Sequence, residues 1–348
     1  CTILLGESLF TSWKGPAHVR LAAELAALPR RDPGLPLPLS LLPPHNNSRG
    51  AADMGCYPHR GPGYKPVTPP GRNTTQILEG CLDGSIQGLV LFHTDILEEY
   101  PDRDLARRAL ESVPFLAVAD THEYETAKHA TVFLPLSSYS EENGTYTNLA
   151  GRIQRAEKAM PQLEGTLTGC QVLLALGERW GASWRQIPPE RVLDSIAREA
   201  VPYQGVTWSG LGREGRMARP VDLALFDSTP ACSLTWPRSL DEPPAPAYPF
   251  RLVRGRRLFD RSGEKRFAPP LVERGEPCVA EIHPDDAARL GVQEGGDVIV
   301  TGELGSARVP ARISAATQPG CVTLLGRYDN VSVNGLAAED NPWIILQP

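Results

Sequence analysis

Short apolar runs alternate with amphipathic patterns along the first half of the chain, and this alternation most limits the fold. The apolar runs are "TILLG" at 2–6, "LPLSLLP" at 37–43, "QGLVLF" at 87–92, "PFLAVAD" at 114–120 and "TVFLPL" at 131–136. Between them, residues 16–28, 75–84 and 102–112 have apolar side chains at helical spacing, and Asp102 is a candidate N-cap. Parallel strands need crossover connections, so the pattern predicts an α/β fold with a Rossmann-like parallel sheet.

The pattern changes near residue 248. Strand-like runs follow at 277–282, 294–302, 305–314 and 320–326, with one short helix whose stop signal is Gly291 after Leu290. We expect a small closed β-barrel here. The sequence therefore divides into an α/β part at 1–200, an irregular Pro- and Gly-rich linker at 201–247 and a barrel at 248–348.

Composition excludes several functions. The formal net charge is -6 and no basic cluster is present, which argues against nucleic acid as a partner. No apolar run reaches the roughly 18 residues that a membrane helix needs, so direct membrane insertion is not expected. The 7 cysteines include no C-x-x-C pair, the spacing typical of iron–sulfur and zinc sites. We predict no catalytic residue and no metal ligand within this sequence.

Polar residues follow directly after the predicted strands. Gly6 ends the first run, "HTD" (93–95) comes after the run at 87–92, Asp120 ends the next run, and the Gly-punctuated stretch "SEENGTYTNLAGRIQRAEKA" follows the strand at 131–136. In open α/β sheets, ligands bind outside the carboxyl ends of the strands. These residues are therefore the candidate binding residues of the first half.

Five motifs in order carry a resemblance to a known superfamily. They are "HNNSRGAADMG" (45–55), "LVLFHTDILEEYPD" (89–102), "LAVADTHEYETAKHATVFLP" (116–135), "ENGTYTNLAGRIQRAEKA" (142–159) and the barrel run that begins "HPDDAARLGVQEGGDVIV" at 283. Together they resemble the molybdopterin oxidoreductase superfamily. The resemblance implies a formate dehydrogenase/DMSO reductase-like architecture in which the final barrel is a double-psi β-barrel.

Within this superfamily the sequence is most similar to the large iron–sulfur subunit of NADH–quinone oxidoreductase, the respiratory complex I. "LFDRSGEKRFAPPL" (258–271) and "NLAGR" (148–152) are the stretches that favour it. This interpretation implies iron–sulfur clusters in an N-terminal region that precedes residue 1, and no cofactor bound by the present chain. It also implies other subunits of a respiratory complex as partners, electron transfer from NADH to quinone, and a peripheral location on the cytoplasmic face of the inner membrane.

The alternative is a molybdenum-dependent oxidoreductase of formate dehydrogenase type that binds a molybdopterin guanine dinucleotide. The resemblance then implies that Asp95 and Asp120 accept hydrogen bonds from guanine or ribose, that Gly144 allows close backbone approach, and that arginines such as Arg152 and Arg155 neutralise phosphate. The full set of implied dinucleotide contacts is Asn47, Thr94, Asp95, Asp120, Gly144, Thr145, Asn148 and Asn334. A third hypothesis is a substrate-free interaction domain, because double-psi barrels also occur in chaperone-like ATPases and decarboxylases. The self-cleaving decarboxylase version rests only on Gly305-Ser306, which also suits a hairpin turn.

Overall fold

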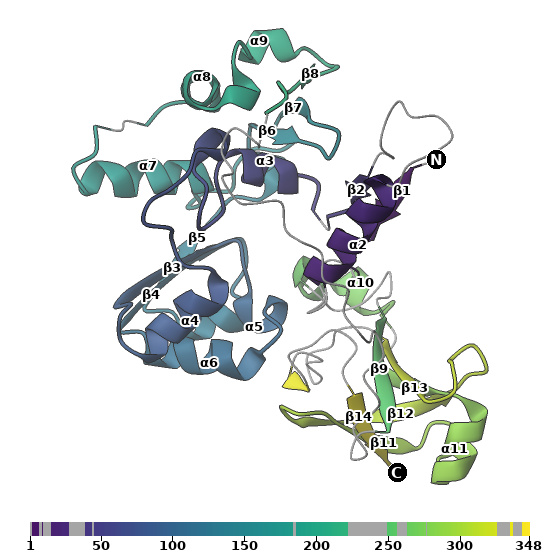
Figure 1. The fold of residues 1–348 in the computed structure, drawn as a ribbon. Helices are drawn as coiled ribbons and strands as arrows, with labels where there is room; N and C mark the ends of the chain where they lie inside the picture. The colour runs from purple at the N-terminus through teal and green to yellow at the C-terminus, as the bar shows by residue number, and fades with distance from the viewer. Residues whose placement is uncertain are drawn as a thin grey trace.

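The computed structural model has an α/β half and a barrel half (Figure 1). It describes residues 2–6, 9, 15–27, 39–43, 45–183, 186–221, 249–255, 263–275, 277–325, 335–336 and 343–348. No helix in these ranges is long and apolar enough to cross a bilayer.

The central sheet consists of three parallel strands in the order β3 (Gly88–Phe92), β4 (Phe115–Asp120) and β5 (Val132–Pro135). Its connections are α4 (Thr74–Leu82), α5 (Ile96–Glu99), α6 (Arg103–Ser112) and the 3-10 turn η2 (Glu125–His129). The Asp102 side chain accepts from the Leu105 N–H, as its position predicts. Leu78, Leu110 and Leu116 lie in the core between the sheet and α4 and α6. Helix α7 (Gly169–Arg179) packs on the other face, against Ala119 and Leu136.

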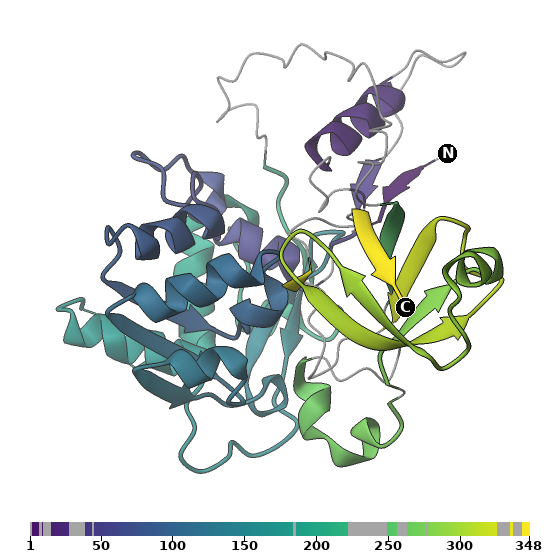
Figure 2. The same cartoon turned by 90° about the horizontal axis from the view of Figure 1, so that it is seen from below.

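The first strands form a separate parallel pair. Strand β1 (Ile3–Leu5) pairs with β2 (Leu39–Leu41) and is connected to it through α2 (Gly15–Ala27). Figures 1 and 2 both show this unit away from the β3–β4–β5 sheet. The expected β-α-β order is therefore present, but it is divided between two sheets.

The Gly-punctuated stretch forms a β-hairpin rather than an extended arm. Strand β6 (Gly144–Thr147) pairs antiparallel with β7 (Arg152–Ala156), and β8 (Arg216–Met217) extends this sheet. Around it lie α3 (Ser48–Asp53), η1 (Pro62–Tyr64), α8 (Pro189–Glu199), η4 (Val201–Tyr203) and α9 (Trp208–Leu211). Of the predicted linker, the structure describes 201–221, where Tyr203 and Leu211 are buried in one cluster with Ile153 of β7.

The C-terminal half closes into a six-stranded barrel in the order β10, β12, β11, β14, β9, β13, and β13 pairs with β10. The strands are β9 (Phe250–Gly255), β10 (Val279–Ile282), β11 (Asp297–Thr301), β12 (Ser306–Ile313), β13 (Cys321–Leu325) and β14 (Trp343–Gln347). Helix α11 (Pro284–Leu290) ends at Gly291, whose φ of 72° gives the predicted left-handed cap. Two strand pairs, β10–β12 and β9–β13, are parallel. The predicted fold class, an α/β sheet followed by a double-psi β-barrel, is confirmed.

A short segment of the barrel half contacts the carboxyl edge of the α/β sheet. It consists of η6 (Gly263–Phe267) and α10 (Pro269–Val272). Arg266 forms an ion pair with Glu98 of α5, and the Gly263 N–H donates to the Glu98 carboxylate at 3.3 Å. The Phe267 ring stacks on His122, with 4.3 Å between ring centroids. These contacts bring η6 to the place where the sheet is expected to bind ligands.

Candidate functional site: two cavities at the carboxyl edge of the sheet

Two adjacent cavities lie where β3 and β4 end, and His93 and Glu264 line both of them. The sheet-end cavity has a volume of about 280 Å³, and its lining residues are His93, Asp95, Glu98, Glu99, Asp120, Tyr124, Gly263 and Glu264. The hairpin cavity has a volume of about 350 Å³, and its lining residues are His93, Thr121, Ser137, Tyr139, Glu142, Asn143, Gly144, Tyr146 and Glu264. Both cavities lie at the carboxyl ends of the strands, where open α/β sheets bind their ligands.

Asp95 is a buried carboxylate with one oxygen that has no hydrogen-bond partner among the described residues. The residue is 6% exposed and precedes α5. Its Oδ1 accepts from the Thr126 hydroxyl at 2.5 Å and from the Thr126 amide at 3.3 Å. Its Oδ2 is the buried oxygen that none of these residues contacts through a hydrogen bond. Burying an unsatisfied carboxylate oxygen is costly, so this atom is suited to accept a hydrogen bond from a bound ligand.

Asp120 and His93 form a pair across the ends of β4 and β3. Asp120 is 4% exposed, and its Oδ1 accepts from the Thr121 amide at 2.7 Å. The His93 Nδ1 lies 3.8 Å from the same oxygen. The neighbouring Asp120 carboxylate raises the pKa of His93, and this effect exceeds the opposing effect of burial. His93 has a φ of 48°, a region that residues other than glycine rarely enter, although histidine does so more often than most.

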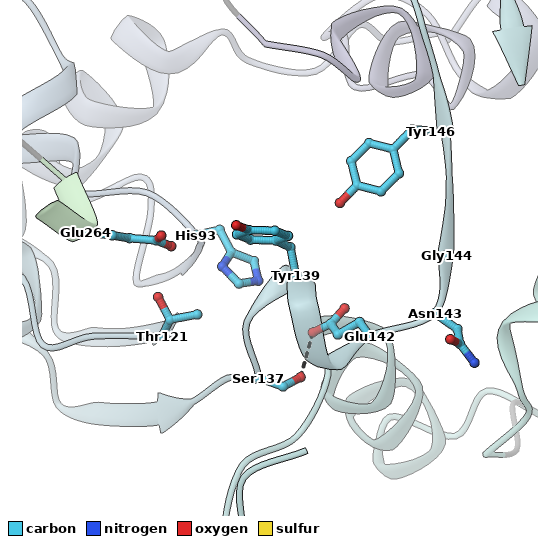
Figure 3. Close-up of a pocket in the computed structure, with 9 residues that line it drawn as sticks. All are labelled: His93, Thr121, Ser137, Tyr139, Glu142, Asn143, Gly144, Tyr146 and Glu264. Carbon is cyan, nitrogen blue, oxygen red and sulfur yellow. Dashed lines mark hydrogen bonds between the residues drawn. The ribbon is translucent and has the colours of Figure 1, made fainter. Parts of the chain in front are cut away.

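The hairpin cavity is lined by aromatic and polar side chains (Figure 3). Glu142 accepts from the Ser137 hydroxyl at 2.7 Å, and Tyr139 and Tyr146 contribute rings to the wall. At Gly144, the first residue of β6, an added Cβ would meet no atom within 4 Å. The backbone of Gly144 therefore borders open space, as close approach by a flat ligand requires.

The structure brings only some of the eight predicted contact residues to these cavities. Asp95, Asp120 and Gly144 line them, and Thr94 lies beside them with its hydroxyl donating to Glu99 at 2.7 Å. Asn334 lies outside the described residues.

The other three predicted residues hold the hairpin together. Asn47 caps no helix N–H with its side chain; its Oδ1 accepts from the Thr147 amide at 2.8 Å and ties α3 to β6. Thr145 pairs with Arg155 in the hairpin ladder. Asn148 Oδ1 accepts from the Arg152 amide at 2.9 Å and closes the turn. The role of all eight residues as ligand contacts stays a prediction.

The sequence places His93 after β3 together with Thr94 and Asp95 but did not mark it as a ligand contact, and it did not mark Glu142 or Glu264 as lining residues. His93 had a usable signal, because it directly follows β3 beside two residues that were selected. Glu142 lies in the stretch that was singled out, but nothing in its spacing separates it from Glu141. Glu264 belongs to the barrel half, and only the contact of η6 with α5 brings it to the cavities. No pattern in the sequence reports that contact.

The lining is rich in hydrogen-bond acceptors. Carboxylates of Asp95, Glu99, Asp120, Glu142 and Glu264 face the two cavities, while Glu98 is engaged by Arg266. Such a lining suits a ligand edge rich in N–H and O–H donors. Within the described ranges, no group of three or more His, Cys, Asp or Glu side chains is arranged to hold a metal ion.

Both halves of the chain match models of known protein families. The family model described as "Molybdopterin oxidoreductase" matches residues 2–179, about half of the chain. The chain belongs to the molybdopterin oxidoreductase family. A second model, described as "Molydopterin dinucleotide binding domain", matches residues 250–342, the barrel half. The superfamily inferred from the five motifs is therefore confirmed.

Individual relatives support the same family. The chain is 30% identical over 309 residues to the NADPH-Fe(3+) oxidoreductase subunit alpha of Geobacter sulfurreducens. The aligned region covers 84% of this chain and 35% of that protein. It is 28% identical over 302 residues to a "putative formate dehydrogenase" of Staphylococcus haemolyticus, over 78% of this chain and 31% of the relative. The chain thus spans about a third of the length of the curated relatives it matches.

The fold is also found in a solved structure. Acetylene hydratase from Pelobacter acetylenicus superposes with a TM-score of 0.61 and 14% identity, over 87% of this chain and 51% of that one. At this identity the likeness supports the architecture alone.

These relatives do not include the protein that the sequence analysis ranked first. The relatives described above are formate dehydrogenase-like and NADPH-Fe(3+) oxidoreductase proteins, so membership of complex I is not shown. The expectation of a chain without a cofactor is likewise unsupported, because the barrel half matches a dinucleotide-binding family. The motifs "LFDRSGEKRFAPPL" and "NLAGR" were therefore too short to separate members of one superfamily.

Proposed function

We propose that this chain is part of a molybdopterin-dependent oxidoreductase of formate dehydrogenase type, and that its two cavities hold the guanosine end of a molybdopterin guanine dinucleotide. The observation that carries the proposal is Asp95, which lines the sheet-end cavity and whose buried Oδ2 has no partner among the described residues. The match of the barrel half to a dinucleotide-binding family supports it.

The residues present fit the nucleoside part of this cofactor. Guanine offers two neighbouring donors, N1–H and the N2 amino group, and a carboxylate accepts both in a charge-assisted arrangement. Asp95 offers its unpartnered Oδ2 to one of these donors in a buried setting, where hydrogen bonds to charged groups contribute most, while its Oδ1 already accepts from Thr126. Asp120 and the acidic lining of the sheet-end cavity offer acceptors for ribose hydroxyl groups.

The bound dinucleotide would supply the pterin that holds the metal at which redox chemistry takes place. The residues of this chain bind and orient it. The rings of Tyr139 and Tyr146 and the open backbone at Gly144 border the space next to the nucleoside site. The contacts of η6 with α5 and His122 hold Gly263 and Glu264 in the lining of the sheet-end cavity. Association with further subunits of a redox complex stays a prediction.

The first test uses the full-length native protein. Acid oxidation is expected to release a fluorescent pterin together with guanine nucleotide, and metal analysis is expected to find stoichiometric molybdenum or tungsten. A preparation that contains its full complement of iron–sulfur clusters but yields neither pterin nor guanine nucleotide would contradict the proposal and would favour a scaffold without this cofactor.

The second test addresses Asp95 directly. In isothermal titration, guanosine is expected to bind the chain more tightly than inosine, which lacks the N2 amino group. Asp95→Asn can replace the acceptor by a donor and should weaken guanosine binding by about tenfold to a hundredfold, the equivalent of one charge-assisted hydrogen bond. Asp104→Asn, an exposed carboxylate on α6, is the matched control and should leave guanosine binding unchanged. Equal affinity for both nucleosides would refute the role of Asp95.

A further inference from the structure

His93 occupies a special place in the site. It lines both cavities, and among the described lining residues it is the one side chain that can carry a positive charge at neutral pH. Its left-handed backbone conformation holds the imidazole at the end of β3, with Nδ1 3.8 Å from Asp120. Backbone strain of this kind persists where the surrounding structure fixes a residue, and it is common at binding sites.

The arginines expected to neutralise phosphate are engaged elsewhere. Arg152 donates to the Glu214 carbonyl at 3.0 Å. Arg155 pairs with Glu157 at 2.8 Å, and its guanidinium lies 5.6 Å from the centroid of the Trp208 ring. Neither of them lines the sheet-end cavity or the hairpin cavity. The acceptor-rich lining that suits a nucleoside would repel a phosphate group, so a nucleotide needs a compensating charge between the two cavities.

We propose that His93, held by Asp120, binds the phosphate next to the guanosine and thereby links the nucleoside site to the hairpin cavity. This inference rests on the proposed function, since it concerns the same ligand. An imidazolium N–H donates to a phosphate oxygen in a charge-assisted hydrogen bond, while neutral imidazole carries no compensating charge. His93 thereby determines whether these cavities accept a nucleotide or only a nucleoside.

The proposal has a defined pH dependence. Asp120 raises the pKa of His93, with further contributions from Glu142 and Glu264. The imidazolium is present at low pH, and its contribution to phosphate binding is lost as the pH rises through the raised pKa. The charged groups that face it from the packed elements are Asp120 of β4, Glu142 before β6, Glu264 of η6, and Asp95, Glu98 and Glu99 around α5.

The test compares two probes that differ only in a phosphate of constant charge. Guanosine is the neutral probe, and the methyl ester of guanosine 5′-phosphate carries one negative charge that does not titrate between pH 6 and 8.5. Binding of both to the chain is measured by isothermal titration across this range. For the wild-type chain, the ester is expected to bind about tenfold more tightly at pH 6 than at pH 8.5, the size of one charge-assisted hydrogen bond. Guanosine binding should change less than twofold.

The variants separate charge from structure. His93→Asn is neutral at every pH and tolerates a positive φ, so ester binding by this variant should no longer depend on pH. His59→Asn, an exposed histidine that lines neither cavity, should behave like the wild-type chain. A urea unfolding midpoint equal to that of the wild-type chain shows that His93→Asn is folded.

The outcomes distinguish the two proposals. Two results would overturn the role of His93 and leave the nucleoside site standing, provided that guanosine binds the wild-type chain. The first is an ester affinity with the same pH profile in the wild-type chain and in His93→Asn. The second is an ester that fails to bind the wild-type chain at any pH. If guanosine itself fails to bind, the proposed function falls. An ester affinity that rises at low pH only when His93 is present supports the inference.

Discussion

The contact between η6 and α5 gives a prediction that links stability to the site. Arg266 and Glu98 form an ion pair with side chains only 22% and 16% exposed. Arg266 also lies over the Tyr124 ring, 5.6 Å from its centroid. Arg266→Met keeps much of the length and apolar surface of the side chain but removes the charge that neutralises Glu98.

The magnitude follows from burial. Breaking a fully buried ion pair costs about 3–5 kcal/mol, and breaking an exposed pair about 0–1 kcal/mol. With both side chains about four-fifths buried, and a cation–π contact worth about 0.5–1 kcal/mol lost as well, we expect the free energy of unfolding to fall by about 2–3 kcal/mol. Because η6 carries Glu264, guanosine binding should weaken too.

Urea unfolding followed by circular dichroism measures this loss. The control is Arg107→Met, which removes two exposed ion pairs on α6, with Asp104 and Glu111, and should leave the free energy of unfolding nearly unchanged. The double variant Glu98→Gln/Arg266→Met should recover part of the loss, because it no longer buries an unneutralised charge. Equal losses for Arg266→Met and Arg107→Met, or strict additivity in the double variant, would refute the reasoning.

Two further predictions concern packing and buried charge. Gly144→Ala places a Cβ in open space, so the free energy of unfolding should change by less than about 0.5 kcal/mol while the pterin content of the full-length protein falls. Gly302→Ala would place a Cβ well inside van der Waals contact with the Leu336 carbonyl and should destabilise the barrel by about 2 kcal/mol or more. Equal effects of the two variants in urea unfolding would contradict both expectations. Burial raises the pKa of Asp53, whose Oδ1 accepts from the Tyr64 hydroxyl at 2.7 Å and whose Oδ2 has no partner among the described residues. The folded state therefore binds a proton on Asp53 more tightly than the unfolded state does. The free energy of unfolding should fall as the pH rises through the raised pKa. Asp53→Asn removes this dependence, and the free energy of unfolding of the variant minus that of the wild-type chain should therefore increase between about pH 4 and 7; a constant difference would show that Asp53 does not titrate in this range.

The candidate site was predicted from the sequence where it depends on strand direction. Asp95 and Asp120 were selected because they follow predicted strands, and parallel pairing of β3 with β4 places both at one edge. Asn47 and Asn148 have the same polar character but serve the hairpin. A polar residue after a strand and a polar residue in a turn look alike in a sequence, since both satisfy backbone groups at the end of an element.

The sequence alone determined the local elements of this protein. Hydrophobic periodicity placed the strands and helices, Asp102 and Gly291 marked a helix start and a helix end, and five motifs indicated the superfamily. These signals are local, because they arise from backbone conformation and from which face of an element is apolar.

Only the tertiary structure decided which elements meet. It separated the β1–β2 pair from the sheet, closed the barrel through β10 and β13, and brought Glu264 of η6 to His93 at the end of β3. The physical reason is that contacts between residues far apart in the chain depend on the complementarity of whole surfaces. No short stretch of sequence carries that information, so the set of charged side chains that line the site could be read only from the tertiary structure.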